Sequence, residues 1–200
     1  MSTSKKLRKA DVSRKTGETD IKISLNIDGS GKSNIDTGIG FFDHMLTAFA
    51  KHGFYDLDCK VKGDLNVDGH HSVEDCGIVL GEAIKKAIGD KAGIYRYGYF
   101  ILPMDDALVL CAVDFCGRPY FSYDLDVREE KCGDFETTLA KEFFYAVSYA
   151  AGINLHIKQI SGENGHHILE AAFKAFGKAV DMATSIDPRV EGVLSTKGAL

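Results

Sequence analysis

The chain has 200 residues, of which 44% are hydrophobic and 26% charged, a composition typical of one large globular domain or two small domains tightly fused. Its net charge of −5 gives no electrostatic footprint for nucleic acid or an anionic membrane, so we expect neither as a partner. No apolar run approaches the roughly 20 residues that a membrane-spanning helix needs, and residues 1–15 are polar and basic, which predicts a cytoplasmic protein.

The first half of the chain predicts two strands, a helix, a third strand and a second helix. Apolar residues alternate over residues 21–27, and a glycine-containing turn leads to another strand at 33–37. A helix is predicted over residues 41–52 and an alternating strand over 55–61. Helical spacing of apolar residues resumes after Gly69.

The second half predicts the same order of elements. Its strands fall at residues 108–115, 120–127 and 153–158, with a helix over 135–151 and another after Gly165. Extra strand material around residues 95–103 joins the halves.

The repeated unit is therefore ββαβα. Two tandem units, at about residues 8–92 and 93–188, predict a single compact α+β domain with pseudo-twofold symmetry. We expect two sheets with their helices packed between them, followed by a functional C-terminal tail at residues 189–200.

The five cysteines form an odd set without a Cys-x-x-Cys pair, which excludes a disulfide framework and a zinc ribbon. We expect reduced, mostly buried thiols.

A Gly-His-His-x-x-Glu motif occurs at Gly69 and again at Gly165. Its histidines and glutamates are His70, His71 and Glu74 in the first half and His166, His167 and Glu170 in the second. On a helix, either histidine can share a face with the glutamate three or four residues later. Adjacent histidines point about 100° apart, so one metal cannot easily take both, and two motifs imply two metals. Nitrogen and oxygen donors without thiolate favour Mn²⁺ before Zn²⁺ or Fe²⁺.

Further histidines extend this set. His44, on the first predicted helix, is the natural additional nitrogen ligand, and its counterpart in the second half lies near Glu142, where a carboxylate replaces the imidazole. His52 and His156 are weaker candidates, at a helix end and on a strand face, where capping or packing is the expected role.

Five segments carry a more specific pattern, and they run in one order from about Arg8 to the last residue. They are Phe42-Asp43-His44-Met45, residues 68–75, Gly117-Arg118-Pro119-Tyr120, residues 166–176 and Ser195-Thr196-Lys197-Gly198. Together they closely resemble the imidazoleglycerol-phosphate dehydratase family of histidine biosynthesis. The resemblance implies a duplicated α+β protein that binds two Mn²⁺ ions per active site. It also implies a 24-subunit shell whose active sites form between neighbouring subunits.

Carried over position by position, the resemblance implies these metal ligands: His44, His70, His71, Glu74, His166, His167 and Glu170. Many members have histidine directly before the second-half Phe-Phe pair, whereas this chain has Glu142. We expect Glu142 to be a further ligand, since a carboxylate can bind Mn²⁺ while lowering the positive potential of the site.

The resemblance also implies a grip on the substrate phosphate by Arg96, Arg118, Lys174, Ser195 and Lys197. Arginine can donate two hydrogen bonds to a dianionic phosphate, and the lysine ammonium attracts its charge. A serine hydroxyl adds a neutral hydrogen-bond donor.

The implied reaction removes water from imidazole glycerol phosphate to give imidazole acetol phosphate. The proton to be lost sits on a carbon without a carbonyl, so base catalysis alone would fail, and two metals holding the ring as imidazolate would let it expel the hydroxyl. Glu18 matches the family's acid–base position and also meets the substrate, and Glu74 and Glu170 join it as catalytic residues. Asp105 and Asp106 are candidate helpers.

Two alternatives use the same donor atoms. A di-metal hydrolase would activate a metal-bound water, and a non-catalytic shell would use the ions only to join subunits. An assay for imidazole acetol phosphate distinguishes all three.

Overall fold

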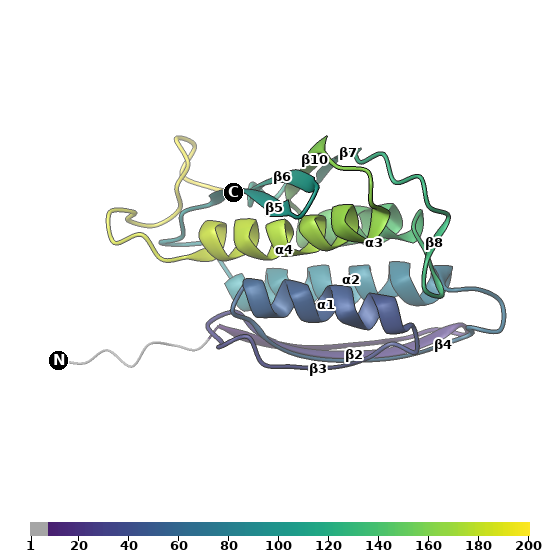
Figure 1. Ribbon diagram of the computed structural model, residues 1–200. Helices are drawn as coiled ribbons and strands as arrows, with labels where there is room; N and C mark the ends of the chain where they lie inside the picture. Colours follow the sequence, from purple (N-terminus) through teal and green to yellow (C-terminus); the bar gives the residue numbers. More distant parts are fainter. Residues whose placement is uncertain (1–7) are drawn as a thin grey trace.

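Two sheets enclose four helices in a four-layer stack, as Figure 1 shows for a computed structural model of the chain. The structure describes residues 8–200, so the first part of the basic stretch at 1–15 lies outside the described residues. Among the helices of residues 8–200, none is long and apolar enough to cross a membrane.

The first sheet has the order β1-β2-β4-β3 and carries α1 and α2 on one face. Its strands are β1 (Lys9–Lys15), β2 (Thr19–Asn26), β3 (Ser33–Asp36) and β4 (Asp56–Gly63), and its helices are α1 (Gly40–His52) and α2 (His70–Ile88). Strand β3 runs parallel to β4, and the other pairs are antiparallel. On β2 the alternating Ile21, Ile23 and Leu25 are buried against the helices, which is why this strand forms the sheet's centre.

The second sheet repeats this topology with the order β5-β6-β10-β7, the parallel pair again lying at one edge. Its strands are β5 (Tyr97–Met104), β6 (Ala107–Asp114), β7 (Tyr120–Asp124) and β10 (Asn154–Ser161), and its helices are α3 (Leu139–Ala151) and α4 (Gly165–Thr184). A small hairpin of β8 (Lys131–Cys132) and β9 (Phe135–Glu136) precedes α3.

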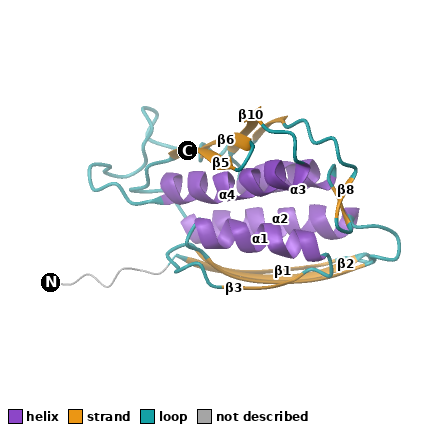
Figure 2. Cartoon of the chain, viewed as in Figure 1, coloured by secondary structure: helices purple, strands orange, loops and turns teal. Residues whose placement is uncertain are grey.

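The predicted α+β class, with two similar halves and helices between two sheets, is confirmed (Figure 2). Each half has an edge strand beyond the predicted ββαβα unit, and the second half also contains the β8–β9 hairpin. Strand β1 was not predicted because only Ala10 and Val12 of its residues are buried, which leaves little apolar alternation. The material at 95–103 is edge strand β5, paired with β6 as β1 is with β2. Helix α3 begins at Leu139 rather than at Phe135, because Phe135 pairs into the β8–β9 hairpin.

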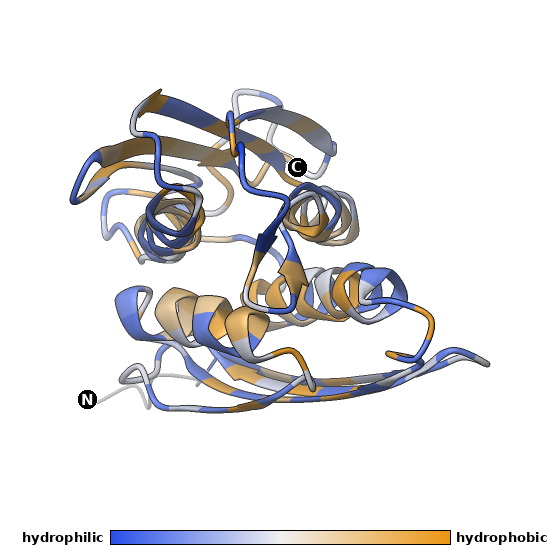
Figure 3. Cartoon of the chain, turned by 45° about the vertical axis from the view of Figure 1, so that its right-hand side comes forward, coloured by the Kyte–Doolittle hydropathy of each residue, from blue (hydrophilic) through white to orange (hydrophobic). Residues whose placement is uncertain are grey.

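The helices form the centre of the core, where α1 packs on α4 and α2 on α3. Figure 3 shows the apolar stretches of these helices between the sheets. The buried positions of α2 and α4 coincide when Gly69 is set on Gly165, as for Val73 and Leu169. Those of α1 and α3 coincide when Met45 is set on Phe143. That alignment places Glu142 at the position of His44.

Gly98 lets β5 approach α4 closely, because a Cβ at this position would overlap the carbonyl oxygen of Ala179 and lie 2.8 Å from the Ala183 nitrogen. We expect Gly98→Ala to lower the free energy of unfolding by about 1–3 kcal/mol through overpacking. Urea unfolding measures this. Gly40→Ala is the matched control, since a Cβ there meets nothing within 4 Å. Equal midpoints for the two variants would contradict the prediction.

The five cysteines are free and buried. The sulfur atoms of Cys59 and Cys76 lie 3.7 Å apart as a thiol pair in the core.

Candidate functional site

Both histidine motifs lie at helix N-termini. Helix α2 starts directly after Gly69, and the His70 backbone nitrogen donates to Asp68 Oδ1 at 2.8 Å. Helix α4 starts at Gly165, and the Asn164 side chain accepts a 3.2 Å bond from the backbone nitrogen of His167. These local contacts fix the first helical turn, so the motif side chains project from ordered backbone.

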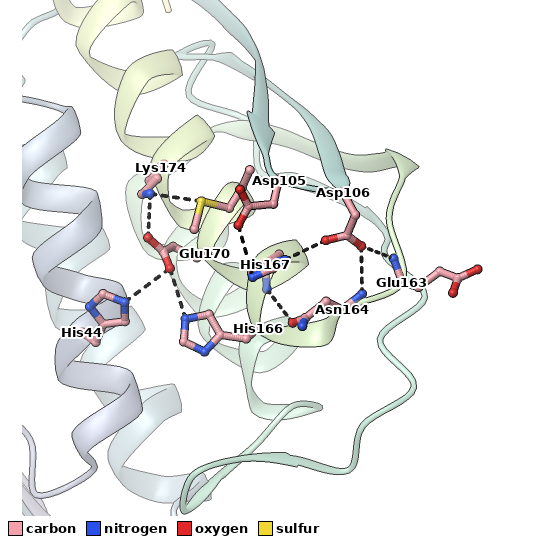
Figure 4. Close-up of polar contacts among 10 residues, drawn as sticks. His44, Asp105, Asp106, Glu163, Asn164, His166, His167, Glu170 and Lys174 are labelled. Atoms are coloured by element: carbon pink, nitrogen blue, oxygen red, sulfur yellow. Dashed lines mark hydrogen bonds and ion pairs between the residues drawn. The ribbon is translucent and has the colours of Figure 1, made fainter.

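His44, His166 and Glu170 form one tight group, drawn in Figure 4. Glu170 Oε2 lies 3.1 Å from His166 Nε2 and 3.4 Å from His44 Nε2. One ligand atom from each residue lies within 4.8 Å of the other two. Two imidazole nitrogens and a carboxylate oxygen, from helices far apart in sequence, fit the donor set of a first-row divalent ion.

Glu170 is held in this group by Lys174, one turn further along α4. Lys174 Nζ lies 2.5 Å from Glu170 Oε1 and donates at 3.6 Å to the sulfur of Met104. Burial alone would raise the pKa of Glu170, but the bond and charge of Lys174, helped by His44, lower it below the usual range. Glu170 is therefore an ionised carboxylate, 7% exposed.

The equivalent place in the other half is more open. His70 Nε2 lies 3.4 Å from Glu74 Oε2, and both side chains are about 40% exposed (43% and 39%). Glu142 is half-buried in the first turn of α3. Tyr149 is the main cause of the raised pKa of Tyr145, and the charges of Glu142 and Glu74 add to it. Within residues 8–200, only the His44 group brings three donor atoms this close, so Glu142 does not complete a second such group within one chain.

The second histidine of the first motif faces away from the first. The rings of His70 and His71 stand at 90°. His71 Nδ1 lies 3.1 Å from Asp64, and its Nε2 lies 3.8 Å from Glu18 in the turn between β1 and β2. The bond to Asp64 is the main cause of the raised pKa of His71.

The second motif repeats this divergence. His166 and His167 have rings at 77°, and His167 Nδ1 lies 2.6 Å from Asp106 while its Nε2 lies 3.5 Å from Asp105. The Asp106 bond is the main cause of the raised pKa of His167. Each motif therefore offers its two imidazoles to two different places.

Four of the five residues expected to grip phosphate line one pocket of about 750 Å³: Arg96, Arg118, Ser195 and Lys197. The C-terminal tail closes one side of this pocket, since Val193 bridges to Ala92 and Ile186 to Ile94. Lys174 does not line the pocket and lies beside Glu170 instead.

Arg96 links the pocket to the tail. It makes a bidentate contact to Asp114 at 2.7 and 3.1 Å, and its Nη1 donates to the Leu194 carbonyl oxygen at 2.8 Å. The Asp114 bond also raises the pKa of Arg96. The guanidinium therefore fixes the tail that carries Ser195 and Lys197.

The weaker histidine candidates lie apart from these groups. Burial, followed by the charges of Lys174 and Lys178, lowers the pKa of half-buried His52 at the end of α1. His156 packs its ring 5.4 Å from Tyr120 on the exposed face of the second sheet.

Comparison with known proteins shows the family to which the chain belongs. The sequence model of the family Imidazoleglycerol-phosphate dehydratase matches residues 37–180. The enzyme of that name from Lachnoclostridium phytofermentans is 64% identical over 96% of this chain and 98% of its own length. The enzyme from Acetivibrio thermocellus is 64% identical over 96% of this chain and 99% of its own length. Two crystal structures of imidazoleglycerol-phosphate dehydratase share the fold. The Staphylococcus aureus structure has a TM-score of 0.80 and 40% identity, and the match covers 88% of this chain and 98% of that one. The Pyrococcus furiosus structure has a TM-score of 0.82 and 42% identity, and the match covers 94% of this chain and 100% of that one.

Proposed function

This chain belongs to the imidazoleglycerol-phosphate dehydratase family, and from that premise we propose that it dehydrates D-erythro-imidazole glycerol phosphate to imidazole acetol phosphate with two divalent metal ions. Family membership makes the chain an enzyme and favours the dehydratase over the hydrolase and the non-catalytic shell. The proposed setting is histidine biosynthesis in the cytoplasm.

The observation that carries the metal proposal is the close group of His44, His166 and Glu170. The related pair of His70 and Glu74 lies at the symmetry-related place, with Glu142 aligned to His44. We assign the ligands as His44, His70, His71, Glu74, Glu142, His166, His167 and Glu170, holding two Mn²⁺ ions per active site. When bound, these ions supply Lewis acidity toward the ring nitrogens of the substrate.

The diverging imidazoles support a site shared between copies of the chain. His71 contacts Asp64 and Glu18, and His167 contacts Asp105 and Asp106, so in this proposal each reaches an ion that another copy helps to hold. A closed shell of 24 subunits satisfies this sharing.

Glu18 is the proposed acid–base residue. Its carboxylate is 57% exposed beside His71, so a substrate can reach it. Thr16 Oγ1 accepts from the Glu18 backbone nitrogen at 3.1 Å, which orders the turn that presents the side chain. A carboxylate placed there can receive the proton lost from carbon or return one to the departing hydroxyl.

The substrate phosphate belongs, in this proposal, in the pocket of Arg96, Arg118, Ser195 and Lys197. Lys197 and Ser195 lie in one turn, because the Lys197 backbone nitrogen donates to Ser195 Oγ at 3.2 Å. Lys174 lies outside this pocket and pairs with Glu170, so it places a positive charge next to the metal ligands.

A turnover assay tests the function. The purified chain with Mn²⁺ should convert imidazole glycerol phosphate to imidazole acetol phosphate. Release of inorganic phosphate instead would indicate the hydrolase, and a metal-bound assembly without turnover would indicate the structural shell.

Lys197→Ala should raise KM for the phosphorylated substrate roughly tenfold or more, because a charge-assisted contact contributes about 1.5–3 kcal/mol. Steady-state kinetics and metal analysis measure the effect together, and metal content should not change. Lys62→Ala, a similar loss of charge at an exposed position on β4, is the control. Loss of metal from the Lys197 variant would show that the tail is structural.

A further inference from the structure

A carboxylate contacts the same ring nitrogen of the second motif histidine in both halves. Asp64 Oδ1 and Oδ2 lie 3.2 and 3.1 Å from His71 Nδ1. Asp106 Oδ1 lies 2.6 Å from His167 Nδ1, as Figure 4 shows. A carboxylate accepts hydrogen bonds, so Nδ1 must carry the proton and donate. In the neutral ring the lone pair is then on Nε2.

The two carboxylates come from different parts of the repeat. Asp64 follows the end of β4, whereas Asp106 lies in the turn between β5 and β6. The residue after β10, at the place equivalent to Asp64, is Gly162, and the turn equivalent to that of Asp106 carries Glu18. Duplication of the backbone therefore does not account for the shared contact. In each half a carboxylate from a different loop contacts Nδ1 of the second motif histidine.

The free side of each ring faces an accessible region. The side chains of His71 and His167 are 34% and 27% exposed, and their Nε2 atoms lie beside Glu18 and Asp105. Asp106 is itself fixed, since its Oδ2 accepts from the backbone nitrogens of Glu163 and Asn164 at 2.7 and 3.1 Å. The orientation of His167 is thus tied to the start of α4.

We infer that Asp64 and Asp106 are positioning residues that hold the Nε2 atoms of His71 and His167 ready to bind the metal ions. This inference rests on the proposed metal-dependent function. Asp106, sequence-predicted as a helper in proton transfer, acts here through His167 rather than on the substrate. Asp64 was not among the site residues predicted from the sequence.

Asp64→Asn and Asp106→Asn test the inference on the full-length chain after chelation. In Asp106→Asn the backbone nitrogens of Glu163 and Asn164 hold the amide oxygen, so the NH₂ faces Nδ1 of His167 and favours the opposite tautomer. The ¹⁵N spectrum of histidine-labelled metal-free protein should then show His167 of this variant moving toward the Nε2–H form. Asp64→Asn leaves a neutral oxygen that can accept from Nδ1 of His71, so it removes the carboxylate charge and not the hydrogen bond. Titration with Mn²⁺ should show one binding step weakened about 10- to 100-fold in each variant. Asp126→Asn, at an exposed carboxylate that pairs with Arg128, is the matched control and should bind Mn²⁺ as the wild type does.

The outcomes separate this inference from the function on which it rests. A wild-type chain that binds no Mn²⁺ would overturn the metal proposal itself. Two-site binding in the wild type, with unchanged Mn²⁺ affinity in both variants and an unchanged His167 tautomer in Asp106→Asn, would overturn only the positioning roles. A lower melting temperature with unchanged Mn²⁺ affinity would show that the carboxylate has a structural role, and this result would also overturn the positioning role. Asp64→Asn keeps the test decisive if Asp106→Asn does not fold, because among the described residues the Asp64 side chain hydrogen-bonds only to His71.

Discussion

Chelation of divalent ions should reduce dehydration by this chain to background, and added Mn²⁺ should restore it better than Zn²⁺ or Fe²⁺. The group of His44, His166 and Glu170 offers nitrogen and oxygen donors without thiolate, which favours a harder ion in a higher coordination number. Without the ion these side chains keep their own hydrogen bonds, and the Lewis acid proposed to act on the substrate ring is lost. Product formation after chelation and after each metal is added back measures the effect, and metal analysis should give about two ions per subunit in active protein.

The fold should survive this treatment because the helices pack through an aromatic core rather than through metal. Phe143 lies between Phe42 and Phe173 with ring centroids 5.3 and 5.2 Å away. Far-UV circular dichroism should therefore stay unchanged. Full turnover by metal-free protein would refute the metal requirement, and a lost circular dichroism signal would show that the ions also hold the subunit together.

The proposed assembly should respond to chelation even though the subunit does not unfold. If ions are shared between copies, their binding free energy becomes association free energy, and metal-free protein should dissociate to smaller oligomers. Light scattering before and after chelation measures the mass. An unchanged mass would indicate that protein contacts alone hold the assembly.

The duplicated fold and the candidate donor residues could be predicted from sequence because their signals are local and repeated, but the sequence did not show that His44 meets His166 and Glu170. Apolar alternation and helical spacing identified most elements, and the repeated His-His-x-x-Glu spacing identified the motif donors. Strand β1 was not predicted because its exposed positions are charged or hydroxyl-bearing. Its pairing with β2 in the structure is what defines it as a strand.

The contacts that position the site could not be predicted because they join residues distant in the chain. Arg96 and Leu194, which fix the tail at the pocket, are 98 residues apart, and His167 and Asp106 are 61 apart. The resemblance named Arg96 and Lys174, but only the three-dimensional structure shows that Arg96 also anchors the tail and that Lys174 bonds Glu170. A lysine four residues after the motif glutamate was the one local signal for that ion pair.

Glu18→Gln should lower kcat by about 10²- to 10⁴-fold, the range typical of losing a general acid–base group. Glutamine keeps the length and the hydrogen-bonding oxygen of Glu18 but cannot take up or release the transferred proton at neutral pH. Stopped assays with saturating substrate and Mn²⁺ measure kcat, and Glu130→Gln, an exposed carboxylate in the loop before α3, is the control. Mn²⁺ affinity should be nearly unchanged, since Glu18 is not among the assigned ligands. A variant that keeps wild-type kcat would remove Glu18 from proton transfer and make Asp105, the carboxylate beside His167 Nε2, the next candidate base to test. If Mn²⁺ affinity fell together with kcat, Glu18 would act through the metal site instead.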